Sequence, residues 1–282
     1  MNCFFVSDLH GRLERYSKMF NIIKTDQPDV LFIGGDIFPN FYPQVDHDFD
    51  DFVYDFLIPE FEKLKLELKE NYPKVFLILG NDDPKIEEPK ILEGEEKQLW
   101  HYVHNKKFSF KSFTIYGYAN IPPSPFIFKD WERYDVSRYV DPGCIHPTEG
   151  KRSVEENIDI EYATIKDDLI SLTGNDSLEK AIFLFHSPPY QTNLDRAALD
   201  GQTFDHVPLD VHVGSIAIQR FIEEKQPLLT LHGHIHESSR IMGDWKQKSG
   251  KTWMFTAAYE FPKLAIIKFN LQNLDRAERI IL

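Results

Sequence analysis

The sequence of 282 residues predicts an α/β fold in which strands and helices alternate along the chain. Five short apolar runs have the length of strands and are nearly continuous, which is typical of strands buried on both faces. Apolar residues at helical spacing lie between several of these runs, and strand–helix–strand order favours parallel crossovers. Hydrophobic residues make up 42% of the chain, which is enough for a substantial core.

Each of the five predicted strands ends in polar side chains that can bind metal. The runs are residues 3–6, followed by Asp8 and His10; residues 29–36, ending at Asp36; residues 74–82, ending at Asn81 and Asp82; residues 181–186, ending at His186; and residues 227–236, ending at His234 and His236. In open α/β sheets, ligands bind beyond the carboxyl ends of the strands. We therefore expect all five polar ends to gather at one rim.

Helices are predicted between these strands from the spacing of their apolar residues. The predicted ranges are 11–25, 52–68 and 214–224, the last with Ser215 as its N-cap. The C-terminal part returns to strands at residues 252–259 and 264–269. We interpret residues 1–282 as one domain.

A loop-rich excursion at about residues 84–175 interrupts this pattern. Residues 84–99 are rich in charge and proline, residues 108–118 predict a hairpin or strand pair, and residues 153–172 predict a helix. The aromatic, proline-rich segment 121–128 either walls a substrate pocket or packs over a second sheet, and we favour the second interpretation.

Composition limits the partners of the protein. The net charge of −13 repels phosphate backbones, so binding to duplex nucleic acid is disfavoured. The two cysteines, Cys3 and Cys144, make no disulfide framework. We find neither a signal-peptide pattern nor an apolar run near the ~18 residues of a membrane span. A cytoplasmic protein without a membrane partner is therefore expected.

The strand ends supply seven candidate ligands with oxygen or imidazole donors: Asp8, His10, Asp36, Asn81, His186, His234 and His236. Such a mixture suits divalent Mn, Fe, Zn or Ni better than Ca or Mg alone. Seven ligands are too many for one zinc ion, which takes about four. Two divalent metal ions sharing one carboxylate would use all seven, and Asp36 is the natural bridge because it stands alone after its strand. We expect Mn²⁺ to support activity in vitro.

The motifs DLH, GGD and GND, a later isolated His and GHIH occur in this order over residues 8–236. In this respect the chain resembles the calcineurin-like metallophosphoesterase family. The resemblance implies a four-layer α/β/β/α sandwich with two mixed sheets flanked by helices. It also implies that Asp8, His10 and His236 bind one metal, that Asn81, His186 and His234 bind the other, and that Asp36 bridges them.

The resemblance further implies hydrolysis of a small phosphorylated substrate. Two metals can lower the pKa of a shared water, and the bridging hydroxide then attacks phosphorus in line. The metals offset the charge that develops in the transition state.

One residue departs from the family pattern. Relatives often carry His directly after the motif Asn, whereas Asp82 stands there in this chain. A carboxylate repels phosphate unless it is protonated or screened, so Asp82 either acts as a protonated acid or has lost the role. A monoester carries about two negative charges near neutral pH and a diester about one. Asp82 therefore favours a phosphodiester over a monoester.

Two further histidines have open interpretations. His212 precedes Gly214 and Ser215 at a helix start, where it could approach a substrate phosphate; the alternative is a histidine of a surface loop. His232, within HGHIH, is expected to point inward or to support the site.

Two other functions are kept as alternatives. One is a nuclease of the same fold, although the acidic composition counts against duplex DNA. The other is a non-catalytic metal-binding scaffold or sensor, which Asp82 in place of His would favour. Intact ligands at all five strand ends count against this second alternative.

Overall fold

Two six-stranded mixed sheets form the centre of the molecule, in a computed structural model that describes residues 1–39, 49–155 and 159–282. Their strand orders are β14-β13-β1-β2-β3-β4 and β11-β12-β10-β7-β6-β5. The first sheet comprises β1 (Asn2–Val6), β2 (Val30–Gly34), β3 (Lys74–Ile78), β4 (His101–Tyr102), β13 (Ala265–Asn270) and β14 (Asn273–Ile281). The second comprises β5 (Lys106–Phe110), β6 (Phe113–Tyr118), β7 (Ala181–Phe185), β10 (Leu229–His232), β11 (Lys246–Ser249) and β12 (Thr252–Thr256).

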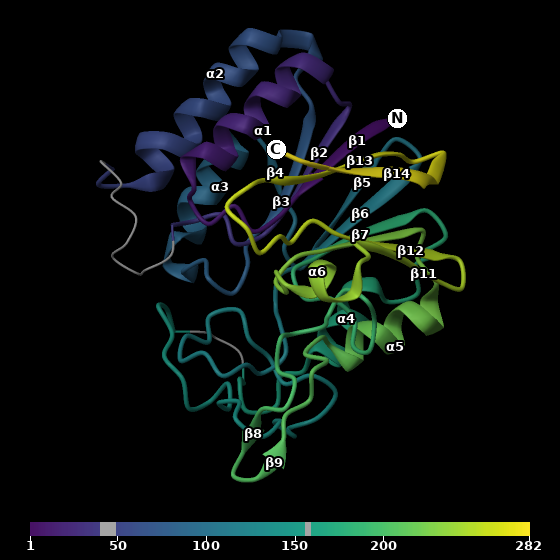
Figure 1. Cartoon of the computed structure of the whole chain (residues 1–282). Helices are drawn as coiled ribbons and strands as arrows, with labels where there is room; N and C mark the ends of the chain where they lie inside the picture. The colour runs from purple at the N-terminus through teal and green to yellow at the C-terminus, as the bar shows by residue number, and fades with distance from the viewer. Residues whose placement is uncertain (40–48, 156–158) are drawn as a thin grey trace.

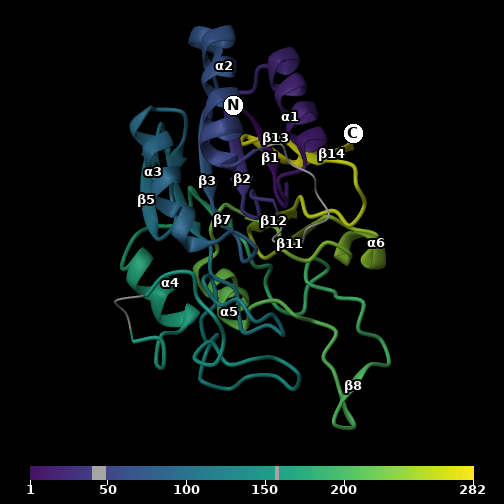
Figure 2. The same cartoon turned by 90° about the vertical axis from the view of Figure 1, so that its left-hand side faces the viewer.

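Helices cover the outer faces of both sheets, as Figures 1 and 2 show. The helices are α1 (Leu13–Asp26), α2 (Ile58–Leu68), α3 (Glu88–Glu96), α4 (Ile165–Thr173), α5 (Ile216–Lys225) and α6 (Ser238–Met242). Short turns η1 (Val53–Leu57), η2 (Lys69–Asn71) and η3 (Lys85–Glu87) adjoin α2 and α3. A small hairpin of β8 (Thr203–Phe204) and β9 (Val207–Pro208) projects from the lower end in Figure 1. The predicted four-layer α/β/β/α sandwich is confirmed.

The continuous apolar runs are explained by burial on two faces. In β7, Ile182 and Leu184 lie in the core between the sheets, while Phe183 and Phe185 belong to the core under α4 and α5. The Phe183 ring lies 5.0 Å from that of Phe221 on α5. Successive residues of a strand point to opposite faces, so both sets must be apolar when both faces are covered.

Parallel pairing brings the predicted strand ends to one edge. β1, β2 and β3 are parallel, with Val6 opposite Ile33 and Gly34 opposite Ile78. In the second sheet β7 and β10 are also parallel, with Leu184 opposite Leu231. The segments that follow these strands therefore leave each sheet on the same side.

The predicted helices 11–25, 52–68 and 214–224 correspond to α1, to η1 with α2, and to α5. Ser215 caps α5 as expected, because its Oγ accepts the backbone N–H of Ile218 at 3.1 Å. The predicted hairpin 108–118 is formed by β5 and β6. No helix in the described ranges has both the length and the apolarity that crossing a membrane requires.

Several elements differ from the prediction, and the unpredicted ones include the short strands β4, β8, β9 and β11 and the helix α6. The helix predicted at 153–172 starts only after Thr164, whose Oγ1 accepts the N–H of Asp167, and residues 156–158 lie outside the described residues. Ser153 instead donates its backbone N–H to Asp130 at 2.7 Å. Residues 84–99 contain α3, with a proline in its first turn, and the charged strand β14 was not predicted.

Candidate metal centre

The predicted ligands follow directly from the carboxyl ends of β1, β2, β3, β7 and β10. Four of them have a left-handed backbone, with φ of 56° at Asp8, 48° at His10, 51° at Asp36 and 72° at His234. This region is uncommon for residues other than glycine and is often associated with functional sites. The backbone turns sharply at each strand end and brings the side chains back over the rim.

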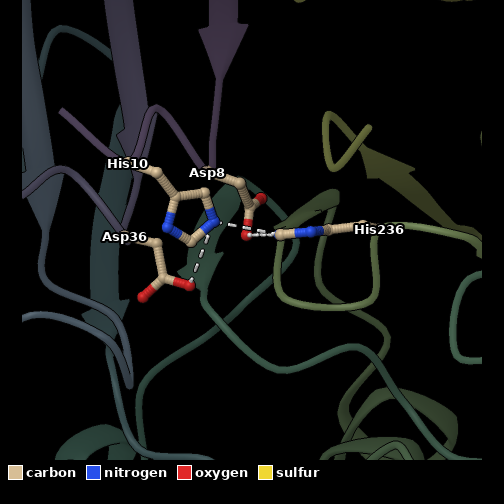
Figure 3. Close-up of side chains that lie close together, drawn as sticks. All are labelled: Asp8, His10, Asp36 and His236. Atoms are coloured by element: carbon tan, nitrogen blue, oxygen red, sulfur yellow. Dashed lines mark hydrogen bonds and ion pairs between the residues drawn. The ribbon is translucent and has the colours of Figure 1, made fainter. Parts of the chain in front are cut away.

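One group of side chains converges on a single point, as Figure 3 shows. One donor atom from each of Asp8, His10, Asp36 and His236 lies within 4.8 Å of the others. The Nε2 atoms of His10 and His236 are 3.1 Å apart, and His236 Nε2 is 3.1 Å from Asp8 Oδ1. His10 Nε2 is 3.8 Å from Asp36 Oδ2. Two imidazoles and two carboxylates are the donors that divalent transition metals prefer.

A second group surrounds the His186 ring on the other side of Asp36. His186 Nδ1 lies 2.8 Å from the carbonyl oxygen of Gly34, which can only accept, so this nitrogen carries a proton. The opposite nitrogen, Nε2, faces Asn81 Oδ1 at 2.9 Å and Asp36 Oδ2 at 3.3 Å. A backbone carbonyl that fixes the ring in this way is characteristic of histidine metal ligands.

His234 completes this second group. Its ring centroid lies 5.3 Å from that of His186, and its backbone N–H donates to Asp8 Oδ1 at 3.0 Å. Burial lowers the pKa of His234 to about 3, which keeps the ring neutral and its lone pair available. All seven predicted ligands thus lie at one rim, from strands of both sheets.

The electrostatics of the cluster favour a bound cation. Burial by itself would raise the pKa of Asp8 and Asp36, but His236 beside Asp8 and His186 beside Asp36 outweigh it. The pKa of Asp36 falls to about 2, and that of Asp8 falls well below its usual range. Burial opposes the charge on His186, yet Asp36 raises its pKa to about 10. The buried carboxylates therefore need positive charge, which divalent metals would supply to this donor set.

Two motif glycines leave space for these side chains. A Cβ on Gly80 would collide with the side chains of Asp36 and His186. A Cβ on Gly233 would collide with those of Ser7 and Asp8. Glycine is required at both positions because the strand-end loops approach each other closely.

Two buried residues that the sequence did not single out fix the geometry of the rim. Asp83 accepts the backbone N–H groups of Ile37, Phe38 and Gly80, each at 2.8 Å. Arg15 donates to the carbonyl oxygen of Asp8 and to that of Phe261. Two features of the sequence could have identified them: for Asp83, the second carboxylate of GNDD, and for Arg15, a positive charge on the apolar face of a predicted helix.

Asp82 lies beside the cluster, with its side chain 38% exposed. Its Oδ1 accepts a hydrogen bond from the side-chain Nδ2 of Asn81 at 2.8 Å, and its Oδ2 is 3.6 Å from His10 Nδ1. Burial, and then the negative charge of Asp36, raises the pKa of Asp82 to about 7. A carboxyl group that is partly protonated near neutral pH therefore lies at the open side of the rim.

The other two histidines occupy different surroundings. His212 donates its Nδ1–H to Asp195 Oδ1 at 2.8 Å and lines a cavity of about 220 Å³ with Tyr190 and Asp210. Among the described residues, none of the predicted metal ligands lines that cavity. His232 is fully buried and is bonded to the carbonyl of Ser187 and the hydroxyl of Thr230, which agrees with a supporting role.

The fold and the cluster define an α/β protein with a rim of histidines and carboxylates that could hold a divalent metal. A family model described as calcineurin-like phosphoesterase matches residues 1–238. The chain therefore belongs to the calcineurin-like phosphoesterase family, whose members are metal-binding hydrolases.

Solved structures share the fold at low sequence identity. One crystal structure aligns over 99% of this chain and 98% of its own, with 16% identity and a TM-score of 0.61. The protein TT1561 of Thermus thermophilus aligns over 99% and 98% with 14% identity and a TM-score of 0.55. A comparison with curated proteins gives no significant match.

Proposed function

We propose that this chain is a dinuclear metal-dependent phosphoesterase that hydrolyses small phosphodiesters in preference to monoesters. The observation that carries the proposal is the position of Asp36 between two groups of ligands. Its Oδ2 is 3.8 Å from His10 Nε2 and 3.3 Å from His186 Nε2. One carboxylate oxygen is thus within reach of a cation on either side.

Asp8, His10 and His236 would hold one metal, and Asn81, His186 and His234 the other, with Asp36 shared. Divalent Mn, Fe, Zn and Ni all suit these donors, and we propose Mn²⁺ for activity in vitro. When bound, the two ions would lower the pKa of a shared water and balance the charge of the phosphate.

The protein itself would orient the ligands and select the substrate. The carbonyl of Gly34 holds the His186 ring with Nε2 toward Asp36, so this ligand needs little reorganisation. Asp82 presents a carboxyl group at the open side, and its ionised form would repel the second negative charge of a monoester. His212, ordered by buried Asp195, is proposed to contact the organic part of the substrate; Pro125 lines both its cavity and that of Asp82.

Turnover with defined metal content tests the proposal. The protein would be stripped of metal, refilled with Mn²⁺ and assayed on 4-nitrophenyl phosphate and bis(4-nitrophenyl) phosphate. Asp36→Asn should lose at least about a hundredfold in rate. Asp26→Asn, which changes only an exposed ion pair with Lys268, should keep the wild-type rate. Turnover without metal, or a wild-type rate in Asp36→Asn, would contradict the proposal.

Asp82 in place of histidine supports one second candidate, a metal-binding scaffold or sensor without turnover. This candidate predicts tight Mn²⁺ binding with no hydrolysis of either ester. A nuclease of the same fold remains the alternative enzyme. Single-stranded DNA as a substrate in the same assay would detect nuclease activity.

A further inference from the structure

Beside the candidate metal centre lies a cavity of about 640 Å³ with two unlike walls. One wall is the polar loop after β3, with Asn81, Asp82 and Asp83. The other is apolar and consists of residues 125–128, Pro-Phe-Ile-Phe. The cavity therefore begins at a proposed metal ligand and ends on a hydrophobic surface.

The apolar wall is unusually exposed for its residue types. Phe126, Ile127 and Phe128 are 53%, 44% and 46% exposed, and they follow one another in the chain. Isolated exposed hydrophobic residues are ordinary, whereas a contiguous group beside a site marks a binding surface. Segment 121–128 thus starts at a buried residue, Ile121, but its tip is exposed and is not packed away as the favoured interpretation expected.

Buried polar bonds hold the exposed tip in place. The fully buried Lys129 ammonium donates to the carbonyl of Ser124 at 2.8 Å and to Glu132 Oε2 at 2.7 Å. Lys151 donates its backbone N–H to the carbonyl of Ile127 at 2.7 Å. The hydrophobic side chains are therefore presented by a braced loop, which lowers the entropic cost of binding.

The same loop is tied to the metal rim. The indole N–H of Trp131 donates to the carbonyl of Asp83 at 2.6 Å, and Asp130 accepts the backbone N–H of Lys85 at 2.8 Å. Both bonds join segment 121–133 to the loop that carries Asn81. The distance between the apolar wall and the proposed phosphate position is therefore set by the fold.

Charge narrows the ligand class further. Among the described residues, the ionisable groups that line this cavity are Asp82, Asp83 and Asp130, all acidic. A second anionic group on the ligand would face these acidic side chains, whereas an uncharged aromatic group would meet Phe126 and Phe128.

We propose that residues 126–128 form a subsite for an uncharged aromatic ester group of the phosphoester substrate. The inference rests on the proposed function, since it assumes that the phosphoryl group sits at the metal rim. Phe126 and Phe128 would then be specificity-determining residues that favour aryl esters over small alkyl esters.

Binding of phosphinates, which carry one negative charge like a phosphodiester and cannot be hydrolysed, tests the subsite apart from turnover. The Mn²⁺-loaded protein would be titrated calorimetrically with dimethylphosphinate and with methyl(2-naphthyl)phosphinate. In the wild type the naphthyl compound should bind about tenfold more tightly, and the combined variant Phe126→Ala/Phe128→Ala should lose most of this ratio. Phe204→Ala is the matched control, because Phe204 is 50% exposed on the β8–β9 hairpin and does not line the cavity.

The outcomes separate this inference from the proposed function. An unchanged affinity for dimethylphosphinate in the combined variant would show that the protein remains folded and that the loss concerns the aryl group. Equal affinities for the two phosphinates in the wild type, or an unchanged ratio in the combined variant, would overturn the subsite alone. Binding of neither phosphinate would contradict the proposed function, and the subsite with it.

Discussion

The Asp83 carboxylate accepts the backbone N–H of Ile37 at 2.8 Å and so joins the segment just after Asp36 to the loop that carries Asn81. Two strand ends that each provide a proposed ligand are thus fixed to each other by one buried side chain. The same carboxylate accepts the N–H groups of Phe38 and Gly80.

Replacing this carboxylate should weaken both stability and metal binding. Asp83→Ala would leave three buried N–H groups without their acceptor, and we expect the free energy of unfolding to fall by about 2–4 kcal/mol. Displacement of Asp36 and Asn81 should lower Mn²⁺ affinity about tenfold or more. Urea unfolding and calorimetric titration measure the two effects. Unchanged Mn²⁺ affinity in a folded variant would show that Asp83 does not position the site.

Asp82 should set the preference between diesters and monoesters. Asp82→Asn removes the negative charge but keeps the shape, so the rate on the monoester should rise about tenfold relative to that on the diester. The ratio of kcat/KM values for 4-nitrophenyl phosphate and bis(4-nitrophenyl) phosphate measures the change, and Asp82→His should shift it in the same direction. If both variants keep the wild-type ratio, the charge argument is wrong.

Metal removal should destabilise the folded protein. The buried Asp8 and Asp36 carboxylates belong to one cluster, in which the donor atoms lie within 4.8 Å of one another. A bound cation would compensate their negative charge. Mn²⁺ at about 100 times its Kd should add about 2.7 kcal/mol to the free energy of unfolding. Thermal unfolding with and without a chelator measures this. The gain should shrink in Asp36→Asn and persist in Asp26→Asn, and an equal gain in both would place metal binding elsewhere.

His104 should make stability fall in mild acid. His104 is half-buried, its Nδ1 accepts the N–H of Ala119 at 3.0 Å, and loss of hydration lowers its pKa from 6.5 to about 3. The unfolded chain binds the proton near pH 6.5 while the folded chain does not, so stability is present above pH 6.5 and is lost as pH falls. At pH 5 the loss should be about 2 kcal/mol relative to pH 8.

His104→Asn provides the comparison, since the Asn Oδ1 can accept the same N–H but does not titrate. Urea unfolding at pH 8 and pH 5 should show a pH-dependent loss that is smaller in this variant by about 2 kcal/mol. The same pH dependence in both proteins would mean that His104 is not responsible.

The strands and the proposed ligands could be predicted because both depend on local patterns. A continuous apolar run such as residues 181–185 indicates a strand buried on two faces, and the residue after it, His186, must lie at the sheet edge. The order of these strand ends also carries the family resemblance. Neither inference needs knowledge of a distant contact.

The remaining features depend on contacts far apart in the sequence. Ser153 leaves the predicted helix because Asp130 binds it, and β14 forms because its charged segment pairs with β13 at the edge of the sheet. Asp83 is recognised only once Ile37 lies beside it. The exposure of Phe126 likewise depends on the buried Lys129–Glu132 pair, which no local pattern predicts.

Stoichiometric reconstitution of turnover tests the central claim most directly. Metal-free protein would be titrated with Mn²⁺ while hydrolysis of bis(4-nitrophenyl) phosphate is followed, and bound metal would be counted in the same samples. The account predicts negligible turnover without metal and full turnover only as the second equivalent binds. Full turnover at one equivalent, or two bound equivalents without any turnover, would contradict a dinuclear phosphoesterase.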